Sequence, residues 1–164
     1  MTVRLRAHHL LCMLTYVGKG YTPAFVENYE ELARRLSAGE DIEIVEGPDD
    51  ICMPLLGDDG AHCHGEGVLV RDRLAAEAVS ELAGVAIHPG VVLRSDEVLL
   101  DRLRSGFRAG GVRSACRGCE WSSLCTRVAG QGYPGVRVGS APVVGEVSDR
   151  TMGTDRGRRA RRSA

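Results

Sequence analysis

Three of the six cysteines in this chain fall within the ten-residue segment CRGCEWSSLC, Cys116–Cys125, and this segment constrains the fold more than any other. Two residues between Cys116 and Cys119 let a tight turn aim both thiolates at one metal ion or cluster, and Cys125 can follow from the next helical turn. The residues between the cysteines are largely polar, which argues against a purely packed core segment. We therefore predict a metal-binding or cluster-binding loop.

A fourth ligand is needed, because three thiolates complete neither a tetrahedral zinc site nor a four-cysteine cluster. Cys52 and Cys63 are candidates, since they end a loop broken by Pro54 and several glycines that can fold toward a shared site. Cys12 lies in the apolar segment LLCML, where cysteine usually packs as a small hydrophobic residue. The predicted metal ligands are Cys116, Cys119, Cys125, Cys63 and Cys52.

Two kinds of metal centre fit this pattern. Structural zinc usually takes its ligands as two close pairs, whereas only Cys116 and Cys119 form such a pair here. An iron-sulfur cluster is larger than one ion and accepts scattered ligands more easily. We expect an iron-sulfur cluster, with the 4Fe-4S and 2Fe-2S types both open, and zinc is the alternative.

Three further residues are predicted to lie near the cofactor. His8 and His9 are neighbours about 100° apart on a helix, so one ion is not expected to take both, but either can share a helix face with Cys12. Trp121, the only tryptophan, lies inside the cysteine segment. We hypothesise that it shields the metal from water and thereby tunes a reduction potential. The alternative for the histidines is a pair making ordinary hydrogen bonds at a helix start.

The segments RLRAHHLLC, PDDIC and CRGCEW with a downstream cysteine resemble a bacterial and archaeal family of unknown function, generally labelled predicted iron-sulfur-binding proteins. The resemblance covers about residues 3–137. It implies a cofactor rather than a reaction, and it favours a role for the HHLLC histidines near the site. Members often carry a further cysteine three residues after the one in DDIC, where this sequence has Leu55. This difference favours Cys63 over Cys52 as the further ligand.

Composition limits the partners. The formal charge of -1 and the pI near 6.5 give no general attraction to nucleic acid or an anionic membrane, and 4% aromatic residues leave few surfaces for stacking bases. No apolar run approaches the roughly 18–20 residues of a membrane span, and the N-terminus lacks the features of a secretory signal. We expect a cytoplasmic protein, where thiols stay reduced and cysteines serve metals rather than disulfides. The oligomeric state stays open.

Periodicity predicts a mainly helical α+β fold in one small domain over 1–139, with few short strands and cysteine-bearing loops. Helices are expected over 7–17, from the cap at Thr22 to about Gly39, over 69–82 and after a cap at Ser95. The segment DIEI predicts a short strand. Residues 140–164 are arginine-rich and poor in core residues, so we predict a disordered tail.

Three functions are compatible with these features. The favoured one is electron transfer or redox sensing with an unidentified protein partner. The second is a zinc-stabilised structural or interaction module that contacts nucleic acid through the arginine tail. The third is a hydrolase-like metalloenzyme that uses histidines and acids such as Asp49, Asp50, Asp58 and Asp59. The sequence lacks the common phosphate-loop, serine-elbow and zinc-protease motifs. Whether the protein is an enzyme stays open.

Overall fold

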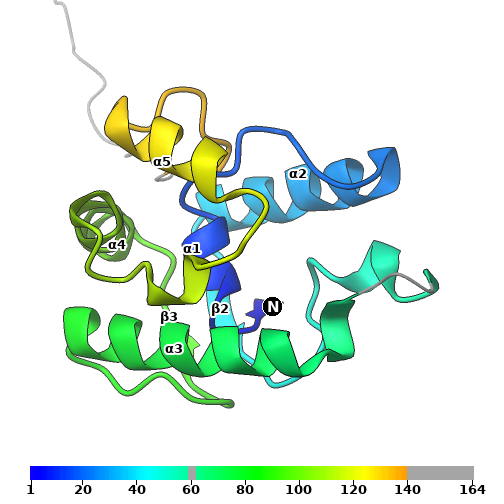
Figure 1. Cartoon of the computed structure of the whole chain (residues 1–164), viewed down its shortest axis with the longest axis horizontal. Helices are drawn as coiled ribbons and strands as arrows, with labels where there is room; N and C mark the ends of the chain where they lie inside the picture. The colour runs from blue at the N-terminus through cyan, green and yellow to red at the C-terminus, as the bar shows by residue number, and fades with distance from the viewer. Residues whose placement is uncertain (59–61, 140–164) are drawn as a thin grey trace, which may run out of the picture.

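A computed structural model describes residues 1–58 and 62–139, and over these residues a small three-stranded sheet is surrounded by helices (Figure 1). The strands are β1 (Thr2–Leu5), β2 (Asp41–Ile44) and β3 (Val92–Leu93). The helices are α1 (His9–Cys12), α2 (Pro23–Ser37), α3 (Glu66–Ala83), α4 (Glu97–Ala109) and α5 (Ser122–Gly130). The predicted mainly helical α+β class is confirmed.

The sheet joins the N-terminus to the middle of the chain. Strand β1 pairs in parallel with β2, with Val3 opposite Ile42, and β2 pairs antiparallel with β3, with Ile42 opposite Leu93. Val3, Leu5, Ile42 and Ile44 are buried, and the residues that alternate with them are more exposed. The predicted strand at DIEI is confirmed, whereas β1 was not predicted.

Helix α2 begins and ends close to where the sequence predicts. The Thr22 side chain accepts a hydrogen bond from the Phe25 backbone N–H at 3.1 Å, and Pro23 occupies the first helical turn, where its missing N–H costs nothing. One face of the helix, from Phe25 to Leu36, is buried against the core. This helix holds the tyrosine Tyr29 beside the cysteine site described below.

The first helix is much shorter than the predicted 7–17. Beyond Cys12 the chain continues in tight turns, in which Leu14 N–H bonds to the Leu11 carbonyl and Thr15 N–H bonds to the Cys12 carbonyl. The apolar residues of this segment are buried on all sides. Their spacing therefore reflects burial of the whole segment and does not define one buried face of a helix. Figure 1 shows α1 near the centre of the molecule, between α3 and α5.

The other helix boundaries shift by a few residues. Helix α3 begins at Glu66, and Gly84 ends it at a φ of 70°. The cap of α4 is Asp96, not the predicted Ser95: the Asp96 carboxylate accepts from Leu99 N–H at 2.9 Å, while the Ser95 hydroxyl donates to the Leu36 carbonyl. The predicted disordered tail, 140–164, lies outside the described residues. Across the described ranges, none of the helices has the length and apolar character that crossing a membrane requires.

Candidate metal centre and adjoining histidine pocket

Four cysteine side chains converge on one small cavity. Cys12 at the end of α1, Cys116 at the end of a short 3₁₀ turn, Cys119 in the next turn and Cys125 in α5 all line a cavity of about 130 Å³. The three cysteines of the CRGCEWSSLC segment are therefore together, as expected. The fourth is Cys12, which the sequence pattern assigned to packing.

The cysteine loop is shaped by backbone hydrogen bonds and one glycine. Cys119 N–H bonds to the Cys116 carbonyl at 3.1 Å, and Gly118 between them has a φ of 71°, a left-handed conformation that favours glycine. The Cys125 N–H then bonds to the Trp121 carbonyl at 2.9 Å in the first turn of α5. These contacts place the three thiols of the loop on the side that faces Cys12.

Burial favours the neutral form of three thiols in this cavity, those of Cys12, Cys116 and Cys125. Burial raises the pKa of Cys12 well above its usual range, and the nearby thiols Cys119, Cys125 and Cys116 raise it further. Burial also raises the pKa of Cys116 and of Cys125; the first rise is partly offset by Arg113 and the second by the Thr15 hydroxyl, which donates to the Cys125 sulfur at 3.1 Å. A bound metal would reverse this balance, because its positive charge deprotonates coordinating thiols.

The buried hydroxyl of Tyr29 fits a group inside this cavity. It lines the cavity, and it finds no hydrogen-bond partner among the described residues. Burial raises the pKa of Tyr29 well above its usual range, so the hydroxyl keeps its proton and acts as a donor. A buried donor without an acceptor is costly, and sulfur atoms of a cluster would supply one.

The size of the cavity favours a cluster over one ion. Its volume of about 130 Å³ is several times the roughly 30 Å³ that one water occupies. A tetrahedral zinc with sulfur bonds of about 2.3 Å would hold its sulfurs about 3.8 Å apart. Among the described residues, one group of three potential ligand atoms lies within 4.8 Å of one another, and it consists of His9, Asp49 and Cys52. No three of the four cysteine sulfurs around the small cavity lie that close together. The four cysteines could therefore bind a metal centre, and their thiols lie farther apart than the ligands of one tetrahedral zinc ion.

Two histidines beside this cavity are each held by a carboxylate. His8 Nδ1 lies 2.6 Å from an Asp72 oxygen, His9 Nδ1 lies 2.6 Å from an Asp49 oxygen, and the ring centroids are 4.2 Å apart. Burial, followed by the charge of His9, lowers the pKa of His8 to about 4. Because carboxylates can only accept, each Nδ1 carries the proton, and the Nε2 lone pair of a neutral ring remains available.

Asp72 also holds the buried side chain of Arg6. The Arg6 Nε and Nη2 donate to the same Asp72 oxygen at 2.8 and 2.6 Å, and Nη1 donates to the Cys63 carbonyl at 2.9 Å. Burial would raise the pKa of Asp72, but the hydrogen bonds from His8 and Arg6 lower it. Arg6 therefore joins the N-terminal segment, helix α3 and the Cys63 turn. The sequence analysis had not singled out Arg6 or Asp72.

Asp49 explains why the segments RLRAHHLLC and PDDIC occur together. One of its oxygens accepts from Arg6 N–H at 2.7 Å and from His9, and the other accepts from Ile51 and Cys52 N–H at 3.1 and 3.2 Å. Burial would raise the pKa of Asp49, but His9 and these hydrogen bonds lower it to about 2. Both oxygens are thus fully used, and Asp49 orients its neighbours rather than binding a ligand itself.

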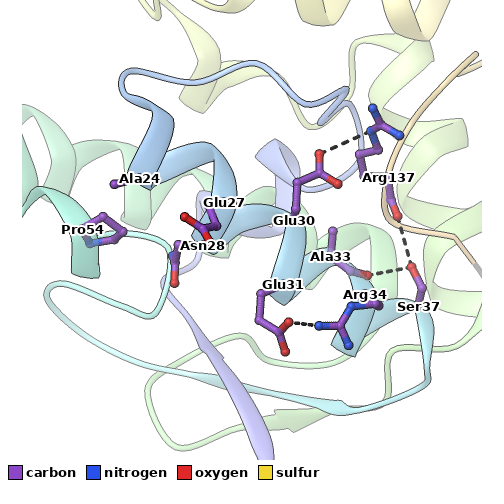
Figure 2. A pocket seen from close by; sticks show the side chains of 10 residues that line it. All are labelled: Ala24, Glu27, Asn28, Glu30, Glu31, Ala33, Arg34, Ser37, Pro54 and Arg137. Atoms are coloured by element: carbon purple, nitrogen blue, oxygen red, sulfur yellow. Dashed lines mark hydrogen bonds and ion pairs between the residues drawn. The ribbon is translucent and has the colours of Figure 1, made fainter.

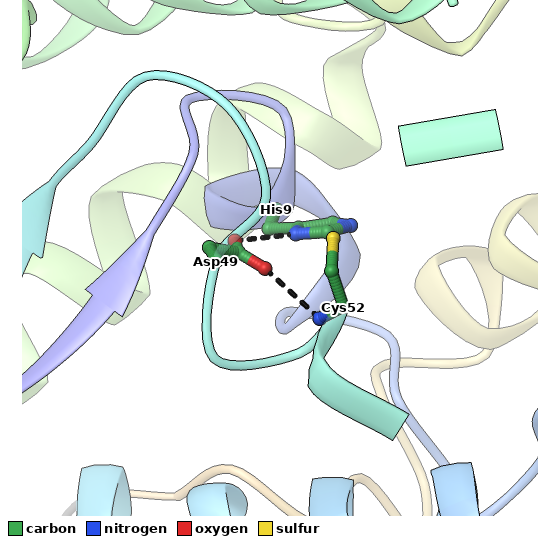
Figure 3. Close-up of side chains that lie close together, drawn as sticks. All are labelled: His9, Asp49 and Cys52. Atoms are coloured by element: carbon green, nitrogen blue, oxygen red, sulfur yellow. Dashed lines mark hydrogen bonds and ion pairs between the residues drawn. The ribbon is translucent and has the colours of Figure 1, made fainter. Parts of the chain in front are cut away.

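Cys52 and Cys63 line a second, larger cavity of about 780 Å³. Both histidines and Cys119 line this cavity as well as the small one. Cys52 and Cys63 do not line the small cavity. The two cysteine loops were expected to meet around one cluster; instead, they meet across this larger cavity. Figure 3 shows Cys52 and Asp49 on either side of the His9 ring, pointing toward one another.

A third cavity, of about 880 Å³, lies along the outer face of α2 (Figure 2). Four of its charged side chains form ion pairs: Glu31 with Arg34, and Glu30 with Arg137 at 3.4 Å. It contains no cysteine or histidine. Asp50, which the sequence offered as a catalytic acid, accepts from Arg4 N–H at 2.8 Å instead and helps to fasten the PDDIC segment to β1.

The chain belongs to DUF1284, a family of proteins of unknown function, whose model matches residues 20–125. The match includes five of the six cysteines and both Asp49 and Asp72, and it begins after the histidine pair. No curated protein and no solved structure matched the chain. The family has no known function, so a functional proposal has to rest on the chemistry of the two cavities.

Proposed function

We propose that this protein binds an iron-sulfur cluster through Cys12, Cys116, Cys119 and Cys125. The observation that carries the proposal is the convergence of Cys12, from the other end of the chain, with the three cysteines of the loop. Four thiols are the complement that both common cluster types require. The Tyr29 hydroxyl, which has no hydrogen-bond partner among the described residues, and the volume of the cavity support a cluster over a single zinc ion.

The surroundings support a redox role, either electron transfer or sensing, with an unidentified protein partner. Hydrogen bonds to sulfur and exclusion of water both set cluster potentials. The Thr15 hydroxyl donates to the Cys125 sulfur, and the Tyr29 hydroxyl is a further donor that a cluster sulfur could accept from. Trp121 lines the cavity and packs edge-on against Tyr21, with ring centroids 5.5 Å apart. The shielding role of Trp121 stays a prediction, which the reduction potential of a Trp121→Ala protein would test: an unchanged potential would remove it.

The direct test is anaerobic purification of the full chain, followed by visible absorption and by iron, sulfide and zinc analysis of one sample. We expect brown protein with iron and acid-labile sulfide in near-equal amounts. If absorption changes reversibly with dithionite and an oxidant, the redox role gains support. Colourless protein with one zinc per chain at the four cysteines would overturn the proposal and favour the structural or interaction module.

A further inference from the structure

We propose that His9 and Cys52 form a second site, separate from the cluster, for a single transition-metal ion of the zinc class. His8 and Cys63 line the same cavity and are the further donors within it. The proposal does not depend on the cluster, because its ligands are different side chains. It rests on geometry and on the chemistry of the donors.

The geometry places two suitable donors together. His9, Asp49 and Cys52 each offer an atom within 4.8 Å of the other two. Asp49 already accepts four hydrogen bonds and His9 Nδ1 is one of the donors, so Nε2 of His9 and the sulfur of Cys52 are the atoms left to bind an ion. Figure 3 shows the Cys52 sulfur beside the part of the imidazole that lies away from Asp49.

The arrangement around His9 is the one that metal-binding histidines need. A ligating imidazole usually donates its other N–H to a carboxylate, which fixes the ring and makes the free nitrogen more basic. His9 has Asp49 in this position and His8 has Asp72, both at 2.6 Å. Ordinary hydrogen bonding at a helix start would not require two buried or half-buried carboxylates for two adjacent rings.

The donor types decide which metals fit. Imidazole and thiolate are ligands for zinc and its transition-metal neighbours, whereas magnesium and calcium prefer oxygen. A nucleophilic Cys52–His9–Asp49 triad is the competing interpretation. However, the Cys52 side chain is buried beside the Asp49 carboxylate, whereas a reactive cysteine needs an electropositive and partly exposed environment. A metal ion would make the same thiol a thiolate by coordination.

Cobalt(II) is the probe for this site, because its bonds to thiolate give intense absorption that zinc lacks. The cluster-loaded full chain is freed of loosely bound metal and titrated anaerobically with cobalt chloride, and cobalt, iron and sulfide are measured per chain. The same titration is made on Cys52→Ala, His9→Gln, Asp49→Asn and Cys116→Ala, and on His64→Gln as a matched control at an exposed histidine. Circular dichroism establishes that each variant is folded.

We expect one cobalt per chain with thiolate absorption in the wild type and His64→Gln. Cys116→Ala should bind at least as much, because the second site is intact and its remaining cluster thiols are free to take cobalt as well. Affinity should fall at least tenfold in Cys52→Ala and His9→Gln, and about 10- to 100-fold in Asp49→Asn, which loses the orienting carboxylate. If Asp49→Asn does not fold, the two ligand variants carry the test.

Unchanged binding in both Cys52→Ala and His9→Gln would overturn the proposal. So would loss of binding in Cys116→Ala alone, because the ion would then lie among the four cysteines. A sample that lacks iron and sulfide but still binds cobalt through Cys52 and His9 would refute the cluster and leave this second site standing.

Discussion

Arg6 is the residue on which the histidine pocket depends most. Its guanidinium is fully buried, and its hydrogen bonds within the described part of the chain go to Asp72 and to the Cys63 carbonyl. A buried cation that keeps its charge after losing its partner is strongly destabilising. The fold of the N-terminal segment is therefore tied to one acid on α3, 66 positions away along the chain.

Replacement of Asp72 by Asn is expected to lower the free energy of unfolding by about 3 kcal/mol, because Arg6 would keep its charge without a carboxylate. Urea unfolding followed by circular dichroism measures this loss. Glu77→Gln, an exposed acid on the same helix, is the matched control and should change stability by less than about 0.5 kcal/mol. Equal effects of the two substitutions would show that the Arg6–Asp72 pair does not anchor the segment.

The site contains residues whose roles the sequence predicts and residues whose roles it does not. The spacing of Cys116, Cys119 and Cys125 was enough to predict that they face one cavity, because these contacts are local. Cys12 was assigned to packing because a cysteine among leucines has no local feature that distinguishes a ligand from a core residue. Its position three residues after His9 was the available signal. The roles of Tyr29, Arg6 and Asp72 depend on burial by distant segments, which no local pattern encodes.

The elements that follow from the sequence are those with local signals. Helix α2 was predicted closely because Thr22 and Pro23 define its start and one apolar face defines its length. Strand β1 was missed because only four residues carry its alternation and its partner begins at Asp41. The predicted long first helix failed for a related reason: Leu10, Leu11, Met13 and Leu14 are all buried, and such a segment has no polar face to define a helix.

The turn between Cys116 and Cys119 gives a prediction about the cysteine loop as an element. A Cβ at Gly118 would meet open space, so a substitution there acts through the backbone alone. With a φ of 71°, alanine costs about 1–2 kcal/mol, and we expect Gly118→Ala to release iron to a chelator about tenfold faster. Release is followed as the absorption of the iron chelate formed.

Gly57→Ala is the control for this experiment. The added Cβ also meets open space, but Gly57 does not have a positive φ. It should release iron at the wild-type rate. Equal rates in Gly118→Ala and wild type would mean that the left-handed turn does not hold the two thiols in place.

At the scale of the whole molecule, two sites share one N-terminal segment. The histidine pair lines both cavities, and Cys119 does as well, so the proposed cluster and the proposed second metal site face each other across common residues. The cysteine loop lies near α1 between α3 and α5, and the PDDIC segment is fastened to β1 (Figure 1). This arrangement accounts for the presence of the three separated motifs in one small fold.

We propose that Cys12, and not Cys52, completes the cluster. The measurement that tests it most directly is the iron and acid-labile sulfide content per chain of anaerobically purified Cys12→Ala and Cys52→Ala. We predict that Cys12→Ala loses most of its iron and sulfide while Cys52→Ala keeps wild-type amounts of both. Full iron and sulfide in Cys12→Ala, together with their loss in Cys52→Ala, would contradict the claim and return the fourth ligand to the Cys52 loop.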